Sequence, residues 1–223
     1  MKNIFGINRL FIILFGILYI CAYDAYSPRT PIKSGVTSLL AITKYSNATQ
    51  NFTSEIDVTN YTTVTFFIKF ARRATTAATA PVNFIVEGLA NTTSLPGYWS
   101  PIATIPSGFA LAVTQTTGTE AAASTVIEMG TTTSFTVSGR VFFDNSTAGN
   151  CEWGQIKSVS GGASITLQEG ITNAQSSTAV YTQAEIFSPI KIDVTDLKKV
   201  RINIDGLSHT QNYAAEILYQ GSN

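Results

Sequence analysis

The chain has 223 residues and carries 14 basic and 14 acidic side chains, so its formal net charge at neutral pH is zero. Only 13% of the residues are charged, and the lack of a basic excess argues against a nucleic-acid-binding surface. One histidine and two cysteines argue against a zinc cluster, and the length fits one large β domain whose core needs no disulfide or metal.

The N-terminal 26 residues form a hydrophobic segment unlike the rest of the chain. In it, Lys2 and Arg9 precede an apolar stretch of 13 residues at 10–22 (LFIILFGILYICA). A basic flank before 7–15 apolar residues is typical of a secretory signal peptide, whereas a membrane-spanning helix needs about 20 apolar residues. We therefore expect a signal-like segment over residues 1–26. An uncleaved anchor, an apolar arm docked on a partner and a misassigned start codon are the alternatives.

Alternating apolar residues predict strands in the first half of the remaining chain. These strands are expected at 38–45, 56–58, 64–70, 82–87 and 98–105. The third strand has apolar residues on one face at a spacing of two, as in a half-buried strand: Val64, Phe66, Ile68 and Phe70. The small, Thr-rich stretch 71–80 that follows is expected to be a solvent loop with Arg72 and Arg73 exposed.

The middle of the chain combines weaker strand signals with dense turn chemistry. The elements expected here are an extended stretch at 109–114, a helical turn at 118–124, a strand at 134–143, a turn at 144–150, a loop at 170–179 and a strand at 180–187. Between them, 152–159 and 164–167 are predicted to form a hairpin, because Gly161 and Gly162 supply the positive φ that a tight turn needs.

A segment of 13 residues occurs twice in the chain. Residues 56–68 (IDVTNYTTVTFFI) return at 192–204 (IDVTDLKKVRINI), with Ile, Asp, Val and Thr in the same order. Each copy predicts a short extended stretch, an Asn/Asp turn and a strand with alternating faces. Asp57 and Asp193 hold matching places, so we expect each side chain to bond a backbone N–H of the following turn. A calcium site is the alternative role for these aspartates.

These elements together predict an all-β fold. A hairpin turn at 205–206 and a last strand at 213–219 complete a set of about ten short strands, with turn signals every 8–12 residues. No ten-residue stretch after the N-terminal segment has the apolar stripe of an amphipathic helix. We predict a single antiparallel β-sandwich domain over 27–223, jelly-roll-like, with a hairpin insertion, preceded by the hydrophobic N-terminal segment (1–26).

Few residues are candidates for chemistry. The one histidine, His209, precedes the last strand among small polar residues, where an ordinary surface position is expected and no Ser–His–acid relay is assembled. Glu87 and Glu152 are the candidates for a glycosidase acid pair, but both fit the outward positions of half-buried strands better. Tyr98 and Trp99 could stack on a sugar or pack between sheets. We assign no catalytic, cofactor-binding or metal-binding residue, expect no enzyme activity and no cofactor, and leave the binding residues unassigned.

Two stretches resemble structural proteins of tailed bacteriophages. Residues 85–102 (IVEGLANTTSLPGYWSPI) are similar to a strand ending in VEGS, a turn, and an aromatic strand ending in WxPI. Residues 151–187 (CEWGQIKSVSGGASITLQEGITNAQSSTAVYTQAEIF) are similar to a hairpin element of phage head and tail components, and Gln175 stands where that element often has His. The IDVT-type segments are also similar to those of phage virion β-sandwiches. These stretches contain no catalytic residue to transfer.

The resemblance implies a structural virion protein, located in the virion as an accessory capsid, decoration or tail-associated subunit that assembles through β-sandwich surfaces. Its implied partners are other virion proteins, such as the major capsid or tail protein, and copies of itself. Nucleic acid is not an expected partner, and a membrane is one only if the N-terminal segment is an uncleaved anchor. The alternative, which accounts for the hydrophobic segment, is an exported bacterial β-sandwich, secreted or at the cell surface, that acts as a surface or carbohydrate-binding module.

Overall fold

The computed structural model describes residues 34–46, 50–74, 80–90, 97–107, 113–116, 119–182, 184–186, 188–207 and 212–223. From Lys33 to Asn223 the chain forms one compact unit. The described residues form antiparallel strands and one short 3-10 helix, with no α-helix among them, so the predicted all-β class is confirmed. None of the described segments is a helix long and apolar enough to cross a bilayer. The hydrophobic segment predicted over 1–26 lies outside the described residues.

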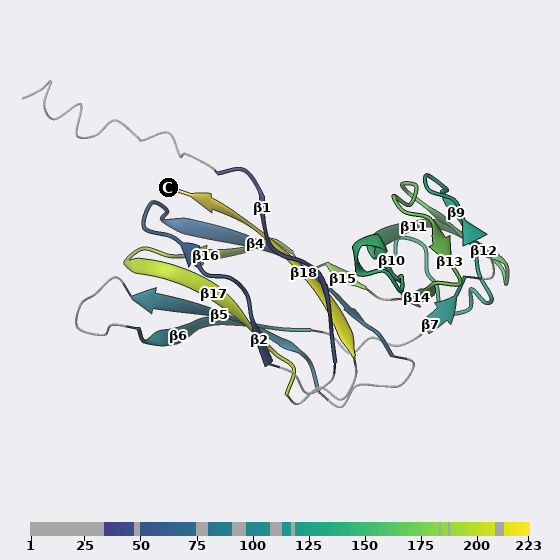
Figure 1. The fold of residues 1–223 in the computed structure, drawn as a ribbon. Helices are drawn as coiled ribbons and strands as arrows, with labels where there is room; N and C mark the ends of the chain where they lie inside the picture. Colours follow the sequence, from purple (N-terminus) through teal and green to yellow (C-terminus); the bar gives the residue numbers. More distant parts are fainter. Residues whose placement is uncertain are drawn as a thin grey trace, which may run out of the picture. The chain divides into compact units, whose positions relative to one another are not determined.

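Two sheets form the sandwich (Figure 1). The first contains β1 (Thr37–Tyr45), β18 (Tyr213–Ser222) and β4 (Thr63–Arg72) in that order, and β15 (Glu185–Ile186) and β16 (Ile190–Asp193) both pair with the far edge of β4. The second contains β2 (Gln50–Phe52) and β3 (Ile56–Asp57) along one edge of β17 (Leu197–Asp205), followed by β5 (Asn83–Ala90) and β6 (Trp99–Pro106).

The strand order is that of an eight-stranded jelly roll. The short strands β2 and β3 lie one after the other on β17, and β15 and β16 do the same on β4, so each pair acts as one interrupted strand. Each sheet then has four strand positions, filled in the orders β1, β18, β4, β15/β16 and β2/β3, β17, β5, β6. All of these pairings are antiparallel, as in the double Greek key of a jelly roll. The predicted sandwich is therefore confirmed.

The sandwich core comes from alternate residues of facing strands. On β4, the predicted apolar face is buried completely, from Val64 to Phe70 in steps of two. Phe84 and Val86 of β5, and Ile202 and Ile204 of β17, face them from the second sheet. A fully buried side chain of this kind contributes about 1.5–3 kcal/mol to stability, and this cluster is the largest apolar core among the described residues.

The two copies of the repeat are related by an approximate two-fold exchange of strands. Ile56 of the first copy pairs with Val200 of the second, and Ile192 of the second copy pairs with Val64 of the first. Ile56 corresponds to Ile192 in the repeat, and Val64 corresponds to Val200, so the two pairings are equivalent. The short strand of each copy therefore joins the sheet that holds the long strand of the other copy, and the turn between them carries the chain from one sheet to the other.

A second β region is inserted between β6 and β15. Its six-stranded sheet contains, in order, β7 (Val113–Gln115), β14 (Ala179–Thr182), β10 (Arg140–Asp144), β11 (Glu152–Ser160), β12 (Ser164–Leu167) and β9 (Val126–Glu128). A pair of short strands, β8 (Thr119–Glu120) and β13 (Gln175–Ser176), and the 3-10 helix η1 (Ala148–Asn150) complete it. The predicted hairpin is the β11–β12 pair, with Gly162 at positive φ in its turn. The insertion has its own apolar core, which includes Phe143, Ile156 and Ile165.

Three predicted elements of the insertion and the C-terminal region are wrong in part. The helical turn expected at 118–124 is replaced over its described residues by β8 and a turn. The strand expected at 134–143 begins only at Arg140, because Ser138 has φ of 67° and turns the chain before it. The Asp205–Gly206 turn does not form a hairpin, because β17 and β18 lie in different sheets.

The expectation that Arg72 and Arg73 are exposed in a solvent loop is also wrong. Strand β4 extends to Arg72, which is buried, and burial lowers the pKa of its guanidinium. Arg73 forms an ion pair with Asp144 of the insertion. Arg73 therefore lies where the sandwich meets the insertion, which composition alone does not indicate.

Candidate functional site

Glu87, a predicted acid candidate, lies on the outer face of the second sheet. Its neighbour Val86 points into the core, so the alternation of β5 turns Glu87 away from it. Its carboxylate accepts hydrogen bonds from Arg201 Nε (2.8 Å) and Asn203 Nδ2 (3.2 Å), both on β17. Glu87 is a structural acceptor that fixes the position of Arg201, and its outward position on a half-buried strand is confirmed.

Arg201 lies between two aromatic rings on this outer face. Its guanidinium carbon is 4.3 Å from the ring centroid of Phe52 on β2 and 4.2 Å from that of Trp99 on β6. Each such cation–π contact contributes about 0.5–2 kcal/mol, depending on solvent exposure. Together with the two residues that bind each other through the Glu87 carboxylate, these side chains form the Arg201 cluster: Phe52, Glu87, Trp99, Arg201 and Asn203.

Two aromatic side chains in or next to the Arg201 cluster are exposed. The Phe52 side chain is 51% exposed, and Tyr98, which precedes the cluster's Trp99, is 67% exposed. One face of the Trp99 ring is covered by Arg201, so that face is not an open platform for a sugar. Exposed aromatics around an ordered arginine are the residue types enriched at the centres of protein interfaces.

Glu152, the second predicted acid candidate, holds a loop of the insertion in place. Its carboxylate accepts hydrogen bonds from the backbone N–H groups of Thr172 (2.6 Å) and Asn173 (3.2 Å), and from Gln175 Nε2 (2.7 Å). These three donors occupy both oxygens. Glu152 and Glu87 lie on different sheets with separate partners, so the contacts assign each a structural role and do not assemble them into a pair.

A pocket of about 320 Å³ lies beside Glu152 and the adjacent Trp153. The pocket is lined by residues of β11, of the 167–172 segment and of β10, together with Lys69 of β4. Lys69 forms an ion pair with Glu216 at 2.8 Å. The Trp153 ring packs against Phe142, with ring centroids 4.6 Å apart, which fixes the indole at the pocket wall.

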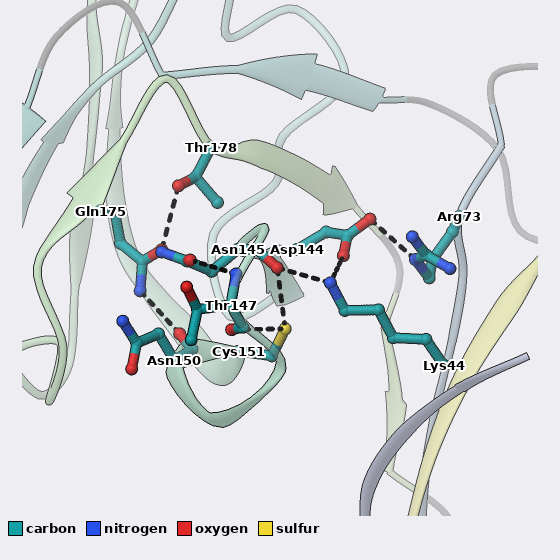
Figure 2. Close-up of polar contacts among 9 residues, drawn as sticks. All are labelled: Lys44, Arg73, Asp144, Asn145, Thr147, Asn150, Cys151, Gln175 and Thr178. Carbon is teal, nitrogen blue, oxygen red and sulfur yellow. Dashed lines mark hydrogen bonds and ion pairs between the residues drawn. The ribbon is translucent and has the colours of Figure 1, made fainter.

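Beside the pocket, Gln175 is the centre of a buried polar network (Figure 2). The side chain of Gln175 is fully buried, and its oxygen accepts hydrogen bonds from Asn145 Nδ2 (2.9 Å) and Thr178 Oγ1 (3.1 Å). Its nitrogen donates to the carbonyl oxygens of Asn150 (3.0 Å) and Asn173 (3.3 Å) as well as to Glu152. Because a buried amide is stable only when both ends are satisfied, this network fixes the loops around η1.

An ion-pair cluster joins the insertion to the sandwich (Figure 2). Asp144, at the end of β10, is 2.7 Å from Lys44 Nζ of β1 and 2.7 Å from Arg73 Nε, which follows β4. Lys44 Nζ also donates to the Asn145 carbonyl oxygen. Burial, and then the nearby Asp144 charge, raises the pKa of Tyr181. An apolar cluster lies at the same junction, with Ala71, Ala214 and Ile42 of the sandwich meeting residues of the insertion: Phe142, Cys151, Trp153, Tyr181 and Ala184.

The remaining sequence candidates have structural roles or lie outside the described residues. Asp57 Oδ1 accepts from Thr59 N (3.0 Å) and Asp193 Oδ1 from Thr195 N (2.8 Å), which confirms the predicted turn bonds. Hydrogen bonds from the hydroxyls of these two threonines, and then those from their backbone N–H groups, lower the pKa of both aspartates. His209 is outside the described residues. Within the described ranges, no group of three or more His, Cys, Asp or Glu residues is placed to hold a metal ion.

Several residues that build these sites carried no signal in the sequence. Arg201 lies in an ordinary alternating strand, so the sequence predicts only that its side chain points outward from β17. Its two aromatic partners are far away in the chain. Lys44, Asp144 and Gln175 likewise meet partners across long sequence separations. The presence of Gln175 in place of His was the one hint that this position matters.

No protein-family model, curated protein or solved structure matches this chain.

Proposed function

We propose that the chain is a non-enzymatic structural subunit of a tailed-phage virion, an accessory capsid, decoration or tail-associated protein that assembles through its sandwich surfaces. Three features support the proposal: the jelly-roll topology, the Arg201 cluster with its exposed Phe52, and the resemblance of 85–102 and 151–187 to virion components. Jelly rolls recur in viral capsid and lectin domains, but one fold hosts many functions, so the surfaces carry more of the argument than the topology.

The observation that carries the proposal is the Arg201 cluster on the outer face of the second sheet. Glu87 and the two flanking rings hold Arg201 in one orientation, so a partner would not have to order that side chain on binding. Phe52, and Tyr98 next to Trp99 in the sequence, remain largely exposed and offer apolar area. A rigid arginine held between two aromatic rings, of which Phe52 is exposed, fits a protein partner, and repetition over many copies strengthens modest single contacts.

The experiment that tests the proposal is incorporation into particles. Virions purified on a density gradient from a lysate that produces the protein should contain the full chain at a fixed ratio to the major capsid protein, measured by quantitative mass spectrometry. Phe52→Ala and Tyr98→Ala should each reduce incorporation by about tenfold or more, because exposed aromatics at interface centres carry most of the binding energy. The matched control is Val137→Ala, which truncates an apolar side chain of the insertion that is 61% exposed.

Absence of the chain from purified particles would overturn the proposal. Equal loss of incorporation in the Val137→Ala control would overturn the assignment of the Arg201 cluster as the contact surface. Circular dichroism of each purified variant shows whether the fold is retained.

The second candidate is an exported β-sandwich module, which the apolar stretch at 10–22 favours. The two candidates differ in the mature N-terminus. Export with cleavage predicts a chain that begins near Tyr26 in the secreted or cell-surface fraction, whereas assembly in the cytoplasm predicts particles in which Met1 is followed by the intact segment. Mass spectrometry of the N-terminal peptide distinguishes these outcomes.

A further inference from the structure

The pocket beside Trp153 contains polar side chains that the fold does not use. Arg140 of β10 and Glu169 both line the pocket, and neither forms a side-chain hydrogen bond or ion pair in the part of the chain that the structure describes. The side-chain amides of Gln155 and Gln168 line it and are also unused among those residues. While these groups are solvated, their lack of protein partners carries no free-energy penalty. Together they provide hydrogen-bond donors and an acceptor around one small pocket.

The pocket has an apolar wall that is fixed by aromatic packing. The Trp153 ring packs on Phe142, so the indole is held in place. Leu167 and Ile171 also line the pocket and add apolar surface to it.

The charge balance at the pocket disfavours an ionic ligand. Two basic residues, Lys69 and Arg140, and two acidic residues, Glu152 and Glu169, line it. Lys69 is paired with Glu216, and Glu152 accepts from the 172–175 loop, so among the described lining residues one cation and one carboxylate have no side-chain partner in the described part of the chain. A phosphate or carboxylate ligand would gain from Arg140 but would be repelled by both glutamates.

We propose that this pocket binds a neutral saccharide of one or two units. Sugar hydroxyls both donate and accept, so they can donate to Glu169 and accept from Arg140 and the glutamine amides, while the apolar face of a sugar ring packs against an aromatic wall. The volume of about 320 Å³ is at the small end of ligand pockets, which limits the occupant to this size. The site is distinct from the Arg201 cluster, and the inference holds whether the chain belongs to a virion or is exported.

The test uses the full chain and a direct signal from the pocket. The sequence has two tryptophans, Trp99 and Trp153, so a Trp99→Phe variant leaves Trp153 as the only indole reporter. A glycan array selects ligands, and titration of the Trp99→Phe protein with the neutral mono- and disaccharides that bind should give a saturable change in its fluorescence. Calorimetry on the unmodified chain gives the dissociation constant.

Matched variants then locate the binding. Arg140→Gln and Glu169→Gln should each weaken saccharide binding by roughly tenfold or more, because each removes a hydrogen bond to a charged group. The controls are Lys157→Gln and Glu128→Gln, which remove a charge from exposed positions on neighbouring strands outside the pocket lining, and they should leave the affinity unchanged. Thermal unfolding of all four variants verifies that the fold is retained.

Three results would overturn the inference. The first is that no neutral saccharide on the array binds. The second is binding that neither changes Trp153 fluorescence nor weakens in the two pocket variants. The third is tighter binding of inorganic phosphate or of an acidic sugar than of any neutral one, which would assign Arg140 to an anion site.

Discussion

At the scale of single residues, Gln175 shows how one buried amide can organise several loops. Its two ends bind the side chains of Asn145, Thr178 and Glu152 and the backbone of two asparagines. All of these partners belong to the insertion, and none is adjacent to Gln175 in the sequence. Loss of this side chain would therefore leave several polar groups without partners at once, including a carboxylate.

We predict that Gln175→Leu destabilises the protein by about 2–4 kcal/mol, because it keeps the volume but leaves Asn145 and Glu152 short of partners. Urea unfolding followed by circular dichroism measures the change. The control, Gln50→Leu, places the same substitution at an exposed position on the edge strand β2, where a change within about 0.5 kcal/mol is expected. Similar losses in the two variants would show that the network around Gln175 contributes no particular stability.

At the scale of elements, the sequence predicts the repeated strand-turn-strand segment but does not predict which strands its two copies pair with. The IDVT pattern and the alternation that follows it predicted the turns at Asp57 and Asp193 and the faces of both long strands, because these depend on neighbouring residues. The exchange of short strands between the copies depends on contacts across more than a hundred residues, which local turn chemistry does not specify. The Asp205–Gly206 turn failed as a hairpin for the same reason.

The matching turns predict matching pH effects at Asp57 and Asp193. The threonine bonds lower the pKa of each carboxyl below the ordinary value of 3.8, so ionised aspartate stabilises the folded state above that value. This contribution is lost as the pH falls through the lowered pKa. We therefore expect the urea midpoint of the natural chain to fall more steeply below about pH 4 than that of an Asp57→Ala/Asp193→Ala variant.

The single variants check the equivalence of the two turns. Asp57→Ala and Asp193→Ala should each remove part of this pH dependence, in similar amounts, because the bonding atoms and distances correspond. A natural chain and a double variant with parallel pH profiles would contradict a role for these carboxylates in the turns.

At the scale of the whole molecule, the sandwich and its insertion have separate cores, which are joined by ion pairs and by an apolar cluster at one junction. The jelly roll was predicted from strand number and turn spacing, but the insertion was expected to be a hairpin and is a sheet with its own core. The two functional proposals fall on different parts: the Arg201 cluster on the sandwich, and the saccharide pocket mainly on the insertion. The junction at Asp144 therefore bears on whether the two parts act as one body.

We predict that Asp144→Ala loosens the insertion from the sandwich. The Asp144 side chain is 8% exposed and pairs with two cations, so its removal leaves Lys44 and Arg73 partly buried without their carboxylate. The free energy of unfolding should fall by about 3 kcal/mol, the lower end of the range for breaking a buried pair, because both cations keep some solvent contact. Hydrogen exchange measured by mass spectrometry should show faster exchange in β10, β14 and the end of β1, with the core strands β5 and β17 unchanged.

Glu55→Ala, which breaks the exposed pair between Glu55 and Lys199, is the matched control and should leave exchange and stability at their natural values. Uniform acceleration across both cores in Asp144→Ala would contradict a local role, since it would mean that the junction is needed for the fold itself.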